Sequence, residues 1–87
     1  MNNLLNPHSV ACKTLARTAM AQRGVNLKTV ADALSKDTST VSRYLSDDHE
    51  HEMGVTSLLI FEAATGDRTI LTYIAQELGM EVREAGQ

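Results

Sequence analysis

Short hydroxyl side chains and one arginine gather in residues 38–46, in a pattern that could bind nucleic acid. Ser39, Ser42, Arg43 and Ser46 recur at the i, i+3, i+4, i+7 spacing of one helix face. Small hydroxyl groups let a helix enter the major groove of a duplex, and arginine can contact guanine or hold a phosphate. Lysines on either side could neutralise backbone phosphates. The candidate DNA-binding residues are Lys28, Thr29, Lys36, Thr38, Ser39, Thr40, Ser42 and Arg43.

Two short helices joined by a tight turn are needed to present this surface, and the sequence predicts them over 27–34 and 38–46. Asn26 can cap the first helix, and Asp37 or Thr38 begins the second. The polar stretch 35–37 suits the turn between them. Ala31 is small enough to allow the two helices to approach closely. The apolar residues expected to form their core are Leu27, Val30, Leu34, Val41, Tyr44 and Leu45.

A longer helix is predicted before this pair, from Asn6-Pro7 to Gly24. Asparagine caps helices, proline suits the first helical position, and glycine at the end takes the left-handed conformation. The apolar stripe of this helix leaves Lys13 outside the core.

Two more helices are predicted after the pair, one from Thr56 or Ser57 to Gly66 and one from Asp67 to Gly79. The fourth helix is apolar almost all round, which is typical of deep burial or of a buried interface. Residues 80–87 are expected to form a flexible tail, and residues 1–87 a single domain. We expect an oligomer interface formed by Leu58, Leu59, Phe61, Ile70 and Ile74.

The composition of the 87 residues is 43% hydrophobic but only 3% aromatic, so one aliphatic core in packed helices is expected. The net charge is −3, yet the charges are unevenly divided. Residues 1–46 carry six Lys or Arg and two Asp or Glu, for a net +4; residues 47–87 carry two and nine, for a net −7. This asymmetry predicts one surface that meets an anion, the alternative being ordinary solvated faces.

Several other classes of protein find no support. No apolar run approaches the roughly 20 residues that cross a bilayer, and the N-terminus lacks the basic start and apolar stretch of a secretory signal, so a cytoplasmic protein is expected. Cys12 is the only cysteine, which excludes an internal disulfide and a cysteine-based zinc site. His49 and His51 lack further ligands at a recognisable spacing, so no metal is expected. Without a catalytic constellation or a phosphate-binding loop, neither an enzyme nor a cofactor is expected.

Residues 31–44, ADALSKDTSTVSRY, resemble the helix-turn-helix of the lambdoid phage CII transcription activators. The second half of the chain resembles short phage regulators of CII type, in which one helix ends in Thr-Gly-Asp, here 65–67, and the next in Leu-Gly, here 78–79. The resemblance covers about residues 10–80, although Ser35 replaces the usual turn glycine and Lys36 a usually apolar residue. The positions that carry it in the first half are Ala31, Asp37, Ser39, Val41, Ser42, Arg43 and Tyr44.

This resemblance implies an all-α, five-helix helix-turn-helix DNA-binding domain of the lambda-repressor type, acting as an oligomer, with RNA polymerase as a further candidate partner. One short recognition helix also buries too little surface for tight specific binding, so a dimer or tetramer reading half-sites about one turn of DNA apart is expected. The prediction is a sequence-specific transcription regulator of phage type that binds double-stranded DNA with residues 38–46 in the major groove. An antitoxin-like protein that binds a partner protein through its acidic half is one alternative. A pure protein-interaction module whose acidic half mimics nucleic acid is another.

Overall fold

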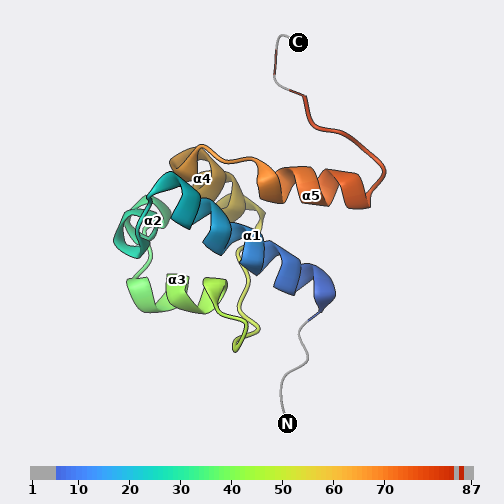
Figure 1. Ribbon diagram of the computed structural model, residues 1–87. Coiled ribbons are helices and arrows are strands. Elements are labelled where there is room, and N and C mark those ends of the chain that lie inside the picture. Colours follow the sequence, from blue (N-terminus) through green and yellow to red (C-terminus); the bar gives the residue numbers. More distant parts are fainter. Residues whose placement is uncertain (1–5, 84, 86–87) are drawn as a thin grey trace.

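Five α-helices make up the fold in the computed structural model, which describes residues 6–83 and 85 and has no strand there (Figure 1). α1 lies across the molecule, with α3 on one side of it and α4 and α5 on the other. α2 packs against both α3 and α4. The all-helical class and all five predicted helices are therefore confirmed. Their bounds are α1 (Pro7–Arg23), α2 (Leu27–Leu34), α3 (Thr38–Leu45), α4 (Val55–Thr65) and α5 (Thr69–Glu77).

The ends of α1 follow the sequence signals. The Asn6 side chain accepts a hydrogen bond from the His8 amide at 2.7 Å, Pro7 is the first helical residue, and Gly24 ends the helix at φ 67°. α4 begins one residue before the predicted range, at Val55, without a side-chain cap from Gly54. None of the described helices is both long and apolar enough to span a membrane.

The hydrophobic core draws on all five helices. Val30, Ala31 and Leu34 of α2 meet Val41 of α3, Ala16 of α1, Phe61 of α4 and Ile70 of α5 in one buried cluster. These side chains include the residues at 31, 34 and 41 that the sequence placed between the two short helices. The core therefore joins the predicted helix pair to the helices of the second half of the chain.

Phe61 and Ile70 correct part of the predicted oligomer interface. Each is only 1% exposed and packs inside the protomer, where a second copy could not reach it. For Phe61, periodicity could not separate it from its neighbours, because α4 is apolar on every side and any of its faces could have been the inner one. Ile70 lies on the apolar face of α5, and periodicity does not say whether such a face packs inside the protomer or against a second copy.

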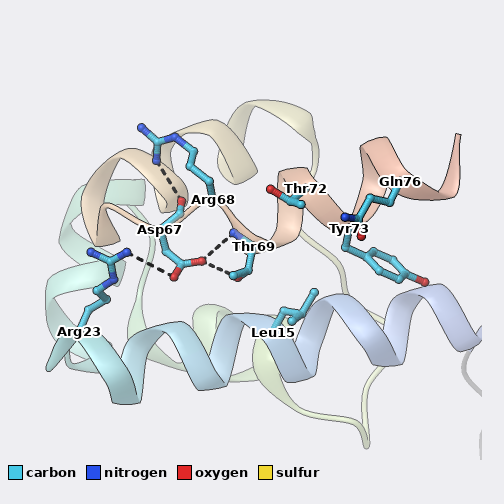
Figure 2. A pocket seen from close by; sticks show the side chains of 8 residues that line it. All are labelled: Leu15, Arg23, Asp67, Arg68, Thr69, Thr72, Tyr73 and Gln76. Carbon is cyan, nitrogen blue, oxygen red and sulfur yellow. Dashed lines mark hydrogen bonds and ion pairs between the residues drawn. The ribbon is translucent and has the colours of Figure 1, made fainter. Parts of the chain in front are cut away.

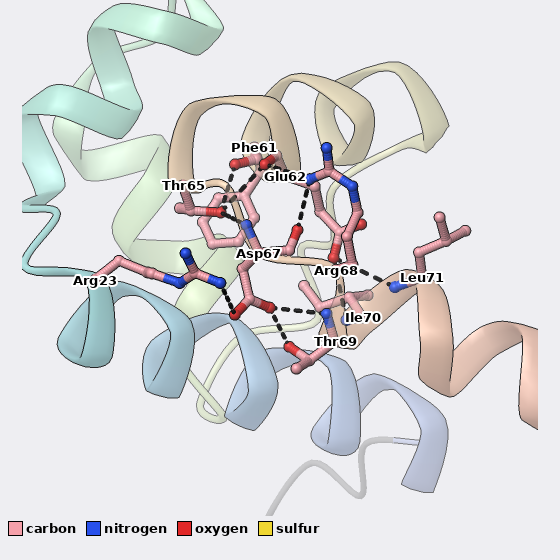
Figure 3. Close-up of polar contacts among 9 residues, drawn as sticks. All are labelled: Arg23, Phe61, Glu62, Thr65, Asp67, Arg68, Thr69, Ile70 and Leu71. Atoms are coloured by element: carbon pink, nitrogen blue, oxygen red, sulfur yellow. Dashed lines mark hydrogen bonds and ion pairs between the residues drawn. The ribbon is translucent and has the colours of Figure 1, made fainter. Parts of the chain in front are cut away.

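Buried polar groups fix the turn between α4 and α5 (Figure 3). Glu62 of α4 is buried, and its Oε2 accepts hydrogen bonds from the amides of Ile70 and Leu71, at 3.1 and 3.3 Å. The predicted cap Asp67 lies one residue before the N-cap position, yet its Oδ1 accepts from both the amide and the hydroxyl of Thr69. The backbone amides in the first turn of α5 thus donate to two carboxylates, those of Glu62 and Asp67, instead of one.

The two carboxyl groups at this turn are shifted in opposite directions. Burial raises the pKa of Glu62, against the opposing effect of the amides of Leu71 and Ile70. The hydrogen bonds from Thr69 lower the pKa of Asp67. Beyond α5, the described residues 80–83 are not helical, and residues 84, 86 and 87 of the predicted tail lie outside the described part of the chain.

The turn between α2 and α3 is tight although it lacks glycine. Ser35 ends α2 in the left-handed conformation, at φ 57° and ψ 42°, and is the one described non-glycine residue with positive φ. The amide of Lys36 donates to the Ala31 carbonyl at 3.0 Å, which closes the end of the helix. A side chain at this conformation is strained relative to glycine.

We predict that Ser35→Gly stabilises the protein by about 0.5–1 kcal/mol, because glycine adopts this conformation without the steric penalty of a Cβ atom. Urea unfolding at pH 7 measures the change. Ser42→Gly, the same substitution in the right-handed backbone of α3, serves as the control and should destabilise by about 0.5–1 kcal/mol. Equal effects of the two changes would contradict the prediction.

Candidate nucleic-acid interface

The outer face of α3 is polar and open to solvent. Thr38, Ser39, Ser42 and Arg43 are exposed and Thr40 is half-buried, while Val41 points into the core at 1% exposure. Tyr44 and Leu45 are half-buried and pack against the core. The structure therefore brings together, on one helix face, the five α3 residues that the sequence singled out.

The start of α3 carries a carboxylate. Asp37 caps the helix, its Oδ1 accepting from the amide of Thr40 at 2.9 Å and from the hydroxyl of Ser39 at 3.0 Å. The side-chain hydrogen bond from Thr40 is the largest of the effects that lower the pKa of Asp37. The backbone amides at this end are poorly suited to a phosphate, because the Asp37 carboxylate already accepts a hydrogen bond from the Thr40 amide and would repel an anion. Contact with a duplex therefore falls to the side chains along the outer face.

A buried lysine holds the other end of α3. Lys13 of α1 is only 3% exposed, and its Nζ donates to the carbonyls of Arg43, Tyr44 and His51, at 3.0, 2.9 and 2.7 Å. Two of these carbonyls belong to the last turn of α3, where helices have no intrahelical donors, and a positive charge there complements the helix dipole. The third belongs to the segment that leads to α4. Burial lowers the pKa of Lys13, partly offset by the carboxylates of Glu52 and Asp47.

Arg17, one turn further along α1, strengthens the same attachment. Its guanidinium group donates to the Leu45 carbonyl and pairs with the Asp47 carboxylate at 3.0 Å. Lys13 and Arg17 together tie the end of α3 and the following segment to α1. The sequence analysis missed this role and placed Lys13 outside the core. Lys13 lies four residues after Ser9 and three before Ala16, and the structure buries all three on one side of α1; nothing in the sequence indicated this, because Ser9 and Lys13 are both polar.

The charged side chains of the first half are mostly neutralised within the molecule. Lys13 and Arg17 are engaged as described, Arg23 lies 3.7 Å from Asp67, and Lys28 lies 3.3 Å from Asp32. Of the two arginines in the second half, Arg68 donates to backbone carbonyls and Arg83 pairs with Glu81. Within the described part of the chain, the side chains of Lys36 and Arg43 alone among the eight lysines and arginines make no hydrogen bond or ion pair.

Lys28 and Thr29 lie on the first turn of α2, and both are exposed. The Thr29 amide and hydroxyl both donate to the Asn26 side chain at 2.8 Å, so this threonine takes part in capping the helix. The contact of Lys28 with Asp32 is solvent-exposed and weak, which leaves the lysine free to exchange partners. These two residues form a smaller polar site at the start of α2.

The acidic segment between α3 and α4 follows directly from the end of α3. Asp47 is tied to Arg17, and the rings of His49 and His51 meet edge-on, with centroids 6.1 Å apart. No three His, Cys, Asp or Glu side chains in residues 6–83 are grouped in a way that could hold a metal ion. The carboxylates of this acidic segment repel phosphates near the C-terminal end of α3. They therefore restrict the direction from which a duplex could approach.

A second candidate site is a cavity of about 390 Å³ between α1 and the start of α5 (Figure 2). Arg23 and Arg68 line it and converge on Asp67. The Arg68 guanidinium donates to the carbonyls of Asp67 and Glu62, at 2.9 and 3.0 Å, and Arg23 faces the Asp67 carboxylate. Both arginines are thus engaged in fixing the α4–α5 turn, which favours a structural role for this cluster over anion binding.

The outer face of α4 exposes apolar side chains. Val55 and Leu59 are 79% and 66% exposed, Ile60 is exposed to a lesser degree, and Leu58 and Ile74 are half-buried. The single charged residue of α4, Glu62, points inward. Of the interface residues predicted from the sequence, Leu59 is exposed, whereas Leu58 and Ile74 pack partly against the core of the protomer.

Comparisons with models of known protein families, with curated proteins and with solved structures find no match to this chain. We therefore infer its function from the geometry of the described residues.

We predict that Lys13→Met destabilises the protein by about 1–3 kcal/mol, because the carbonyls of Tyr44 and His51 lose the Lys13 donor and that of Arg43 keeps only the Ser46 amide, while the aliphatic volume is kept. Urea unfolding at pH 7 measures the loss. Lys28→Met is the matched control; since Lys28 is exposed, the change should stay within about 0.5 kcal/mol. The role of Lys13 as a helix cap would be refuted by equal, small effects of the two substitutions.

Proposed function

We propose that this protein is a sequence-specific transcription regulator of phage type, a helix-turn-helix protein that places α3 in the major groove of double-stranded DNA. The observation that carries the proposal is the distribution of unpaired positive charge. Lys36 and Arg43, whose side chains lack intramolecular partners in the described part of the chain, lie on the turn before α3 and on its exposed face. The other six lysines and arginines each make a hydrogen bond or an ion pair within the described residues.

The chemistry of the outer face fits base reading. Arg43 can donate two parallel hydrogen bonds to guanine, and the hydroxyls of Ser39 and Ser42 can donate to or accept from base edges. Lys36 carries a point charge suited to a backbone phosphate. The small size of the hydroxyl side chains leaves the helix backbone free to lie deep in the groove.

We predict that Arg43→Ala weakens binding to the preferred duplex by about 1–3 kcal/mol and relaxes the sequence preference, because a base contact is lost. The duplex is first obtained by binding-site selection from random DNA at near-physiological salt, and affinities are then measured by fluorescence anisotropy. Lys36→Ala, the comparison, should weaken all sequences about equally and reduce the salt dependence by about one phosphate contact. Arg83→Ala, which removes a charge already paired with Glu81, should change neither property. A uniform loss with Arg43→Ala would refute base reading.

Self-association is the second part of the proposal. A single recognition helix of eight residues contacts only a few base pairs, so two copies reading repeated half-sites would supply the missing affinity. The exposed apolar face of α4 is the surface proposed for this contact. It carries no outward charge, although the half of the chain to which it belongs has a net −7.

We predict that Leu59→Asp lowers the association constant at least tenfold, since it places a charge on the apolar face while leaving the core untouched. Sedimentation equilibrium measures association, and circular dichroism checks that the helices remain. Gln22→Glu, the same change in charge at an exposed position of α1, should leave association unaltered. A wild-type protein that stays monomeric at millimolar concentration would refute this part of the proposal.

An antitoxin-like protein is the second candidate, favoured by the same apolar face within the acidic half. In that case α4 would bind a different protein. Purification of the chain only together with a second protein, and loss of that protein with Leu59→Asp, would support the antitoxin over the self-associating regulator.

A further inference from the structure

A cavity of about 210 Å³, open to solvent on the side of Glu52 and Val55, has walls from every helix except α2. Cys12 of α1, Tyr44 of α3, Leu58 of α4 and Ile74 of α5 line it, together with Met53 from the segment before α4. All five side chains are half-buried. The volume exceeds the roughly 150 Å³ of an apolar cavity known to hold benzene, so it suits a molecule built on one small ring.

The charged groups at this cavity differ in how they are satisfied. Lys13 lines one wall, but its ammonium group already donates to three carbonyls. Glu52 lines the solvent-exposed edge, and in residues 6–83 its carboxylate takes part in no hydrogen bond or ion pair. The thiol of Cys12 has a raised pKa because of burial and of the nearby Glu52 charge, so it is neutral at pH 7. Of these charged groups, the Glu52 carboxylate is therefore the one without a hydrogen-bond partner among the described residues.

We propose that this cavity is a binding site for a small organic cation. The apolar body of the ligand would lie against Met53, Leu58 and Ile74, and its ammonium group would meet the Glu52 carboxylate at the edge. Apolar walls with one well-placed charged group are the usual make-up of a small-molecule site. The inference does not depend on DNA binding, since the cavity lies on the inner side of α3 and its lining shares no residue with the polar outer face.

Benzylamine, protonated at pH 7, is the probe. Titration followed by ¹H–¹⁵N correlation spectra should give saturable shifts at Cys12, Tyr44 and Met53. Because Cys12 is the only cysteine, the rate of its alkylation by iodoacetamide reports occupancy directly and should fall as benzylamine is added. Benzyl alcohol, which has the same shape without the charge, should bind about fivefold more weakly, and benzoate more weakly still.

Two variants complete the test. Glu52→Gln removes an exposed charge and should lower the affinity for benzylamine about fivefold, to that of benzyl alcohol, without changing the fold. Glu50→Gln, the matched change at an exposed carboxylate that does not line the cavity, should leave the affinity unaltered. Absence of saturable shifts, equal affinities for the three probes, or equal effects of the two variants would each overturn the proposal. DNA affinity measured on the same samples keeps this result separate from the test of the proposed function.

Discussion

An α-helix of eight residues leaves half of its carbonyl groups without an intrahelical donor, and in α3 a lysine from another helix supplies the donor that is missing. The rest of the proposed site depends on this contact. A helix of two turns is not stable in isolation, so its position has to come from its neighbours. Val41, with Tyr44 and Leu45 partly packed beside it, fixes which face of α3 is buried. Lys13 and Arg17 add a polar attachment, by holding the last carbonyls of α3 and the start of the following segment against α1.

A buried carboxylate has the corresponding role at the start of α5. Glu62 is the one charged residue of an otherwise apolar helix, and it is buried where its carboxylate meets the first amides of α5. A cation thus meets the end of α3 and an anion meets the start of α5, as the dipole of each helix favours. Each of these buried charges is solvated by backbone groups that would otherwise lack partners, which explains why burial is tolerated at both positions.

Internal pairing also gives the surface charge its pattern. The sequence suggests a basic first half with six cations, but four of them are engaged within the molecule. The positive charge that lacks a partner among the described residues is therefore concentrated at Lys36 and Arg43. A small basic surface bounded by the acidic segment after α3 would give weak non-specific attraction to DNA. Proposed specificity would then depend on base contacts and on a second copy more than on long-range attraction.

The sequence by itself determined the elements, because helix ends and helix faces are encoded locally. Asn6, Gly24, Asn26, Asp37 and Gly66 each satisfy or end a helix through their own side chain or backbone, and the exposed face of α3 follows from the spacing of its hydroxyl residues. What lies inside was decided only by the tertiary structure. Lys13 reads as a surface residue and is buried, while Phe61 and Ile70 read as interface residues and belong to the core. These outcomes depend on which carbonyls and which apolar faces are brought together from distant parts of the chain. Periodicity along one helix carries no information about the groups that a neighbouring helix leaves unsatisfied.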